Sequence, residues 1–409
     1  MKIWLKLLIG TAAGILAGLF FPDVWSDIKV IEQLSTVAIN IGRFIIFPLV
    51  FFSVVTGIHS LVQKKKVLGI LSRSVLYMVI VSALLSVFGT ISVLLLSPER
   101  IPVFIQESSH ITLPSFYETI LSIFPTNFFS VFFQDGNQIL PIFIMAVLIG
   151  FNMNFDKVIT RATVQLFESI SGIFYHINSF INELMGFFIF PMAWFITEQI
   201  ISTAEIEVFR QMLFAIAADI LILVFIIYPI ILYFATGRKN PYKWIYAALA
   251  PALAAIASGD SLFCLSLQIK NSSANMGSKP EAATVSLPLL SVFSKAGTAM
   301  VTGISFIVIL KSYSSLGLNF SGVIWVSTFA FLSSFIVGPF PGTGVFVAVS
   351  LLCSIYGRGI EEGYLILKPI LPILFSASVL MDTLTNSLIS MVASRNAGLH
   401  EEIPAAKFK

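Results

Sequence analysis

Charged residues are scarce in this chain. Asp, Glu, Lys and Arg make up 11% of its 409 residues, against roughly 25% in a typical soluble domain. Hydrophobic residues make up 57%. A soluble fold would need a polar surface, and the few charges here are bunched between long apolar runs. The composition therefore predicts a protein that is solvated by lipid.

Other features are also missing. The chain has two cysteines, Cys264 and Cys353, and both lie in apolar segments, so a disulfide framework is not indicated. The net charge is only +3, which argues against nucleic acid as a partner. The first apolar run continues past Gly18 without a small-residue cleavage site, so it is interpreted as a retained span and not a signal peptide.

Basic residues gather in short clusters between the apolar runs. The positive-inside rule places such clusters in the cytoplasm, and this predicts a multi-pass inner-membrane protein with both termini cytoplasmic. Segment 98–138, which contains His110, has no basic cluster and is expected on the external side. The clusters are Lys2 and Lys6; Lys64, Lys65, Lys66 and Arg73; Lys157 and Arg161; Arg238, Lys239 and Lys243; and Arg395, Lys407 and Lys409.

The N-terminal half is expected to hold six membrane helices, because about 20 helical residues cross the hydrocarbon. Arg43 lies in the second expected span and Asp219 in the sixth. A proline, Pro191, is expected to break the fifth. The expected spans are 3–21, 34–58, 67–97, 139–153, 158–201 and 213–236.

The apolar runs of the C-terminal half are interrupted near their centres. Irregular backbone at membrane depth is tolerated only where it is buried in protein or lines a cavity. Paired interruptions therefore predict a transporter site, formed by two re-entrant hairpins and two broken helices in an inverted repeat. Run 247–267 is interrupted by Ser258, Gly259, Asp260 and Ser261, and run 323–352 by Gly338, Pro339, Pro341, Gly342 and Gly344; runs 285–310 and 365–392 follow them.

Two groups of polar residues lie inside these C-terminal runs. Lys295 stands in an apolar helix, where an ammonium costs several kcal/mol unless it is paired or hydrated. It is interpreted as a fixed cation in a polar cavity, the alternative being a lysine that extends to the interface. Asp382, Asn386 and Ser390 are spaced to share one helical face. Asp382 is the first candidate partner of Lys295 and Asp260 the second; a purely structural ion pair is the alternative.

Three function classes remain open at this point. The first is a secondary transporter, and the second is a channel, which also contains re-entrant segments. The third is an intramembrane hydrolase in which Lys295 activates Ser258 or Ser294. No nucleophile motif accompanies that pair, so the chain is not expected to be an enzyme. The expected partners are a small solute and membrane lipid; no metal or cofactor is predicted beyond a coupling Na⁺ or H⁺.

Several short motifs, spread over nearly the whole chain, resemble those of one known family, the dicarboxylate/amino acid:cation symporters, which include the glutamate transporters. The similarity is strongest where residues 287–289 lead to 297–299, which are similar to the family's seventh-helix signature, and at 341–344, similar to its second hairpin tip. The other similar segments are 8–22, 48–58, 124–127 and 138–141.

The resemblance implies an all-α polytopic fold with eight transmembrane helices and two re-entrant helical hairpins, as in the glutamate transporters. It implies a scaffold at 1–243, a transport core at 244–395 and a cytoplasmic tail at 396–409. It further implies a homotrimer that carries an amino acid or dicarboxylate by an elevator-like motion. The substrate-binding residues it implies are Ser258, Asp260, Ser261, Thr298, Pro341, Gly342, Thr343, Gly344, Asp382, Thr383 and Asn386.

The chain also departs from the family pattern. Where the family has Asn-Met-Asp-Gly-Thr, residues 294–298 are Ser-Lys-Ala-Gly-Thr, so a sodium-binding aspartate is replaced by Ala296. Counted without gaps from Pro341, Asp382 falls on the family's substrate-recognising arginine and Ser390 on a second sodium-binding aspartate. The resemblance thus implies altered selectivity and altered cation sites, with Ser294, Lys295, Asn386 and Ser390 as the cation or cation-substitute residues.

Overall fold

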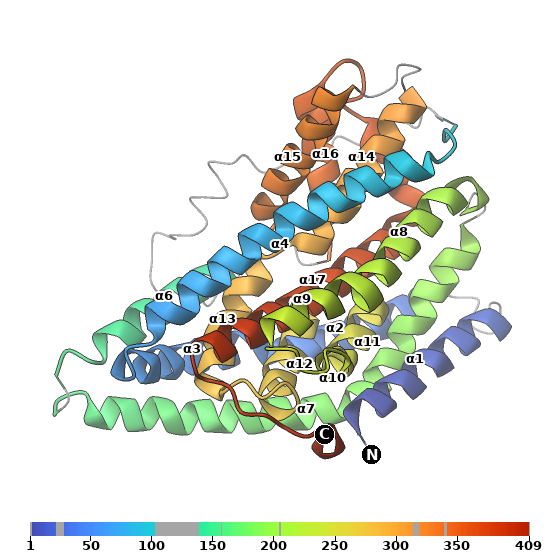
Figure 1. The fold of residues 1–409 in the computed structure, drawn as a ribbon. Coiled ribbons are helices and arrows are strands. Elements are labelled where there is room, and N and C mark those ends of the chain that lie inside the picture. The colour runs from blue at the N-terminus through green and yellow to red at the C-terminus, as the bar shows by residue number, and fades with distance from the viewer. Residues whose placement is uncertain are drawn as a thin grey trace.

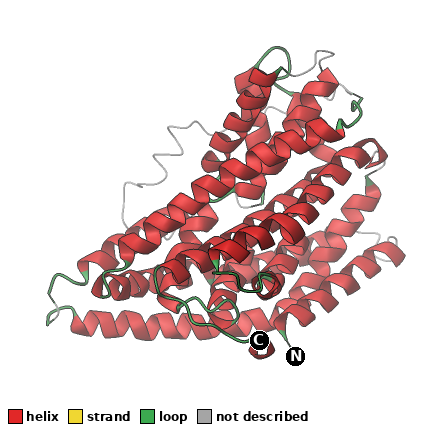
Figure 2. Cartoon of the chain, viewed as in Figure 1, coloured by secondary structure: helices red, strands yellow, loops and turns green. Residues whose placement is uncertain are grey.

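Nearly all of the described chain is helical, as Figure 2 shows. The computed structural model describes residues 2–21, 28–102, 139–156, 158–203, 206–313, 319–338 and 342–408. Within these ranges there is no strand, only one isolated bridge between Ser278 and His400. His110, Lys157, Lys409, Pro341 and motif 124–127 lie outside the described residues. The expectation of an all-α protein is confirmed.

The N-terminal helices follow the apolar runs of the sequence. The predicted first and third spans are each found as one helix, whereas the second is divided in two at Ile45. The helices are α1 (Ile3–Phe20), α2 (Ile28–Phe44), α3 (Ile46–Gln63), α4 (Val67–Leu96), α6 (Ile139–Asn152) and α7 (Arg161–Ser202).

The predicted break near Pro191 is wrong, because α7 runs through this proline without interruption. A proline removes one backbone hydrogen bond, and membrane helices tolerate this where neighbouring helices support them. Helix α1 gives that support. A Cβ on Gly14 would lie only 2.4 Å from Phe190 O, so the two backbones are in direct contact beside the proline.

The sixth predicted span is one helical stretch with an irregular middle. It consists of η2 (Ile206–Phe209), α8 (Arg210–Ile222), η3 (Leu223–Ile227) and α9 (Tyr228–Ala235). The η3 segment is a π-helix, in which backbone bonds run from i to i+5. Directly after it, Tyr228 forms a hydroxyl hydrogen bond of 2.6 Å with Thr385 Oγ1.

In the C-terminal half the first predicted interruption is found, since α11 ends at Ser258 and α12 begins at Ser261. At the second, α15 ends at Ile336 and α16 begins at Gly344, whereas Pro339 and Pro341 lie outside the described residues. The elements are α10 (Tyr242–Ala247), α11 (Leu249–Ser258), α12 (Ser261–Ala274), α13 (Pro280–Phe293), α14 (Ala296–Tyr313), α15 (Phe320–Ile336), α16 (Gly344–Tyr356), η4 (Gly363–Ile370), α17 (Leu371–Asn396) and η5 (Ala405–Lys407).

Only one of the two predicted broken helices is broken in the described chain. Helices α13 and α14 are parted at Ser294 and Lys295. Helix α17 is continuous from Leu371 to Asn396, so the second break is wrong. The sequence of α17 has no glycine, and its single proline, Pro372, lies in the first turn, where proline is tolerated.

Seven helical stretches of the described residues are long and apolar enough to cross a membrane: Ile3–Phe20, Val30–Gln63, Val67–Leu96, Arg161–Ser202, Ile206–Ala235, Pro280–Tyr313 and Gly363–Asn396. Shorter apolar helices are α6, α11, α15 and α16. The protein is therefore a multi-pass membrane protein. The number of eight spans stays a prediction, since most of segment 98–138 lies outside the described residues.

Both chain ends lie at the same end of the molecule (Figure 1). Tyr246 joins them, because its ring packs against Trp4 and against Phe408, each at a centroid distance of 5.8 Å. At the centre, α14 packs between α4 and α17, and its residues from Ala296 to Leu310 are buried. A Cβ on Gly89 of α4 would lie 2.8 Å from Met300 O, so α4 contacts the backbone of the broken helix directly.

Candidate functional site

Asp260 organises the turn between α11 and α12, the first tip. Gly259 adopts a left-handed φ of +57° that ends α11, a conformation open to glycine without strain. Asp260 then caps α12, its Oδ1 accepting the Phe263 amide at 2.7 Å. Capping by aspartate satisfies an N–H that a helix start leaves unpaired. The tip is thus a helix end followed at once by a helix start.

Asp260 also forms an ion pair with Arg43, which lies in the last turn of α2. Arg43 Nε donates to Oδ1 at 3.2 Å, and Nη2 donates to Oδ2. The two side chains are 24% and 5% exposed. Sequence reasoning missed this pair and assigned Asp260 to Lys295 instead. A lone arginine near the end of an apolar helix was the available signal.

Gly342, which lies just before α16, is beside the first tip. A Cβ on Gly342 would lie 2.9 Å from Gly259 O and 3.6 Å from Asp260 Oδ2. A Cβ on Gly344 would lie 3.6 Å from the Thr298 methyl group. Thr343, between them, is exposed. The structure therefore brings both interruptions to the start of α14.

Lys295 lies at the break between α13 and α14 and is only 3% exposed. Its Nζ donates to Ser261 Oγ, at the start of α12, over 3.1 Å. In the described residues it forms no ion pair with a carboxylate, although Asp382 and Asp260 are near enough for their charges to act on it. The expected direct pair of Lys295 with Asp382 is therefore not formed.

Asp382 is bound instead by the start of α14. Its Oδ1 accepts from Gly297 N at 2.7 Å and from Thr298 N at 3.2 Å, and its Oδ2 accepts from Thr298 Oγ1 at 2.8 Å. The residue is 1% exposed. The first amides of a helix attract negative charge, so a carboxylate of the chain itself fills this position.

Three further polar residues of α17, Thr383, Asn386 and Ser390, form hydrogen bonds with α12 or α13. Asn386 Nδ2 donates to Leu290 O at 3.3 Å, and Ser390 Oγ is hydrogen-bonded to Ser286 Oγ at 2.7 Å. Thr383 O accepts from Gln268 Nε2 at 2.8 Å. Sequence reasoning missed Gln268, an amide in the apolar run that follows the first break.

Two buried oxygen atoms at the break have no hydrogen-bond partner among the described residues, Ser294 Oγ and Asn386 Oδ1. Their residues are neighbours, because Ser294 N and Asn386 Nδ2 both donate to Leu290 O. Since Leu290 O can only accept, the amide oxygen is the atom left over. Unpaired buried polar atoms are uncommon and call for a partner.

The described residues do not form a hydrolase site or a metal site. Lys295 is hydrogen-bonded to Ser261 and to neither Ser258 nor Ser294 in the described chain, so the serine and lysine pair of the alternative hydrolase does not form. The searched, described residues contain no group of three or more His, Cys, Asp or Glu able to hold a metal ion.

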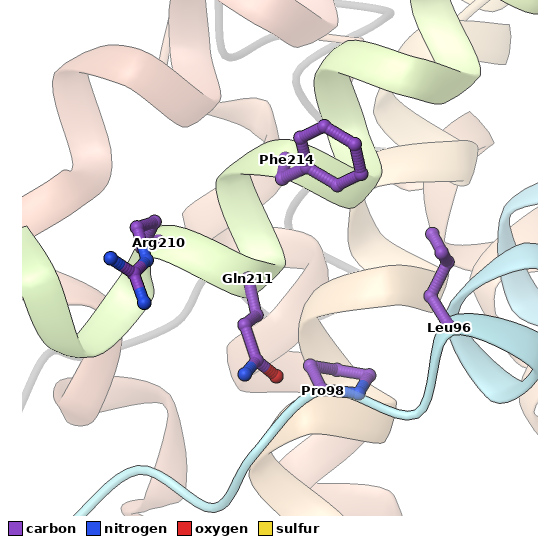
Figure 3. A pocket seen from close by; sticks show the side chains of 5 residues that line it. All are labelled: Leu96, Pro98, Arg210, Gln211 and Phe214. Atoms are coloured by element: carbon purple, nitrogen blue, oxygen red, sulfur yellow. The ribbon is translucent and has the colours of Figure 1, made fainter.

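A pocket of about 240 Å³ lies away from these residues, between the end of α4 and the start of α8 (Figure 3). It is lined by Leu96, Pro98, Arg210, Gln211 and Phe214. Arg210 is paired there with Glu207 over 3.6 Å, and both side chains are largely exposed. None of the hairpin, α13 or α14 residues reaches this pocket, which is therefore separate from the candidate site.

One family model matches most of the chain. The model of the sodium:dicarboxylate symporter family matches residues 3–396. Similar curated proteins are the C4-dicarboxylate transport proteins of Cupriavidus pinatubonensis, 28% identical over 44% of this chain and 43% of the relative, and of Edwardsiella ictaluri, 25% identical over 53% and 47%. The chain thus aligns with less than half the length of these relatives.

Proposed function

Because the chain belongs to the sodium:dicarboxylate symporter family, we propose that it is a secondary active transporter of a small carboxylate-bearing solute, an amino acid or a dicarboxylate. The observation that carries this proposal is the buried polar group at the break of α13 and α14. Lys295 supplies a positive charge there, and Ser294 and Asn386 supply unpaired oxygens. The chain is a transporter and not an enzyme.

We propose an elevator-like cycle in a homotrimer of the inner membrane. Residues 244–395 form the moving transport core and residues 1–243 the scaffold. The site is enclosed, since Lys295, Thr298 and Asp382 are each at most 3% exposed, so a solute reaches it only after a rearrangement. Gly259 and Gly342 are in contact, and in this proposal the movement of one of these two turns opens the site to the solute. Substrate contacts at Ser258, Pro341, Thr343 and Thr383 belong to the same proposal.

We further propose that coupling to sodium is weakened or lost. Hard cations need several oxygen ligands. Ala296 offers no side-chain oxygen, and the Ser390 hydroxyl is already bonded to Ser286. The ammonium of Lys295 supplies part of the positive charge that a bound sodium ion would supply. Removing this charge is therefore expected to weaken transport more than removing sodium does.

Uptake into proteoliposomes tests the proposal, with L-serine, L-lactate and succinate as labelled probes under separate sodium and proton gradients. We expect saturable accumulation of a carboxylate without a sodium gradient, and a loss of at least about ten-fold in Lys295→Met, equal to 1.4 kcal/mol of binding. Lys311→Met is the matched control, because Lys311 lies at the other end of α14 and also donates to a serine, Ser97 Oγ, at 2.8 Å.

Two results would contradict the proposal. Strict sodium dependence that persists unchanged in Lys295→Met would remove the role of the lysine. Flux that does not saturate with probe concentration would favour a channel, the second function class, over a transporter.

A further inference from the structure

The start of α14 is already occupied by an anion of the chain itself. Three donors, Gly297 N, Thr298 N and Thr298 Oγ1, converge on the Asp382 carboxylate at 2.7 to 3.2 Å. A helix start of this kind binds a carboxylate or phosphate from a ligand when it is vacant. Here Asp382 takes that place and satisfies these donors.

The contact between α14 and α17 leaves no space for a second anion at this point. A Cβ on Gly297 would lie 2.4 Å from Met381 Cβ, 2.5 Å from Ser378 O and 2.9 Å from Asp382 N. The first turn of α14 therefore rests on the backbone of α17. A ligand carboxylate reaches these amides only if the Asp382 side chain is removed.

Lys295, unlike the start of α14, has no anionic group bound directly to it in the described chain. An ammonium has three N–H groups, and in the described chain its single hydrogen bond is to Ser261 Oγ. The charges of Asp382 and Asp260 act on Lys295, but neither carboxylate forms a direct ion pair with it, and a buried charge without a direct partner is costly. One anionic group from a ligand would supply that partner. Ser294 Oγ and Asn386 Oδ1, unpaired at the same break, would in addition accept hydrogen bonds from a hydroxyl or amino group.

We propose that Asp382 is a built-in substitute for a second substrate carboxylate, and that the site therefore takes a monocarboxylate carrying a hydroxyl or amino group, and rejects dicarboxylates. The ligand carboxylate pairs with Lys295, and its hydroxyl or amino group donates to Asn386 Oδ1. A second ligand carboxylate would face Asp382, whose negative charge repels it. This inference rests on the proposed function and selects among the carboxylates that it allows.

The test is ligand-dependent thermal stability of the purified full-length protein, since a ligand that binds only the folded state raises its apparent stability. The probes are L-serine and L-lactate as monocarboxylates and succinate as the dicarboxylate. In the wild type, at least one monocarboxylate should bind at least about ten-fold more tightly than succinate. In Asp382→Ala, the vacated start of α14 and Lys295 offer two anion positions, so this preference should fall by at least about ten-fold.

Asp219→Ala is the matched control, because Asp219 is also a buried carboxylate (1% exposed) but lies in α8, bonded to Ser92 of α4. It should leave the preference unchanged. If Asp382→Ala does not fold, Asp382→Asn keeps the side-chain shape, removes the charge, and should shift the preference in the same direction.

The outcomes separate the inference from the function on which it rests. Wild-type protein that binds succinate as tightly as both monocarboxylates, or a preference that Asp382→Ala and Asp382→Asn leave unchanged, overturns the inference while a carboxylate transporter stands. Absence of binding and of uptake for all three probes overturns the proposed function itself, and the inference with it.

Discussion

Gly297 is a residue at which α14 closely approaches the backbone of α17. Alanine there would overlap Met381 Cβ and Ser378 O, and overpacking of this kind typically costs 1–3 kcal/mol. We expect Gly297→Ala to lower the midpoint of thermal unfolding by several degrees and to weaken probe binding, both measured on detergent-purified protein.

Gly172→Ala in α7 is the control for this substitution, since nothing lies within 4 Å of a Cβ at that position. In a helix interior, alanine is favoured over glycine by up to about 1 kcal/mol. Equal behaviour of the two variants would show that the α14 to α17 contact is not tight.

At single residues, the sequence identified the important charges but not their partners. Lys295 and Asp382 stood out because charge inside an apolar run is costly. Their actual partners, Ser261 and the amides at the start of α14, lie 34 and 84 to 85 residues away. No local pattern encodes such contacts, because they depend on how the helices pack.

At the scale of elements, the sequence predicted breaks well where several breakers coincide. Ser258 to Ser261 combine a glycine with a capping aspartate, and the chain turns there. Pro191 stands alone, and packing on α1 carries α7 through it. Two broken helices were expected, but no position was predicted for either break. One break is found at Ser294 and Lys295, and α17 has none.

The ion pair between α2 and the first hairpin leads to a further prediction. Arg43→Gln and Asp260→Asn, combined in a double-mutant cycle, should show a coupling free energy of about 1–3 kcal/mol, because both side chains are largely buried. Asparagine still caps α12, so the cycle isolates the ion pair. Chemical or thermal unfolding of the four proteins measures the coupling.

Lys239 and Glu402 form the comparison pair, since their side chains are 46% and 47% exposed. Exposed pairs contribute about 0–1 kcal/mol, so Lys239→Gln and Glu402→Gln should show little coupling. A coupling at Arg43 and Asp260 no larger than this would mean that the hairpin tip is held by other contacts.

At the scale of the whole molecule, the tail after α17 folds back onto the turn between α12 and α13. Lys279 N donates to Leu399 O at 3.0 Å, and Glu401 N donates to Gly277 O at 2.8 Å. His400 lies between these bonds, and in the described chain neither ring nitrogen has a hydrogen-bond partner. Burial, followed by the charges of Arg395, Lys243 and Lys239, lowers the pKa of His400 to about 4, against a smaller opposing effect of Glu401.

This pKa gives stability a defined pH dependence. The unfolded chain, with a histidine pKa near 6.5, binds more protons than the folded chain between pH 6.5 and about 4. Stability therefore falls as the pH drops through this window and is fully retained above it. We expect His400→Gln to remove a loss on the order of 1 kcal/mol, discounted for partial exposure, in unfolding midpoints measured from pH 7 to 4. An identical pH profile for both proteins would contradict this.

Membrane orientation is the last prediction at this scale. A cysteine at Lys65, in a background where Cys264 and Cys353 are alanine, should resist an impermeant thiol reagent in intact cells and react after lysis, because basic clusters stay in the cytoplasm. A cysteine at Glu99, beyond the opposite end of α4 and exposed, should react in intact cells. The reverse labelling pattern would invert the orientation.

The π-helix η3 (Leu223–Ile227) lies between two regular helices, α8 and α9. A π-turn is the local trace of one extra residue in an α-helix. Because the wider π-turn takes up that residue, the helix after it keeps nearly the orientation that it would have after a regular turn one residue shorter. Deleting one residue there should therefore restore regular winding and leave Tyr228 close to Thr385, its partner at 2.6 Å. Deleting one residue from the regular helix α8 instead would turn Tyr228 by about 100° about the axis relative to the start of α8, with a shift of about 1.5 Å along it. The hydroxyl contact between α9 and the site-bearing α17 should thus survive a deletion in the π-turn and be lost after a deletion in α8.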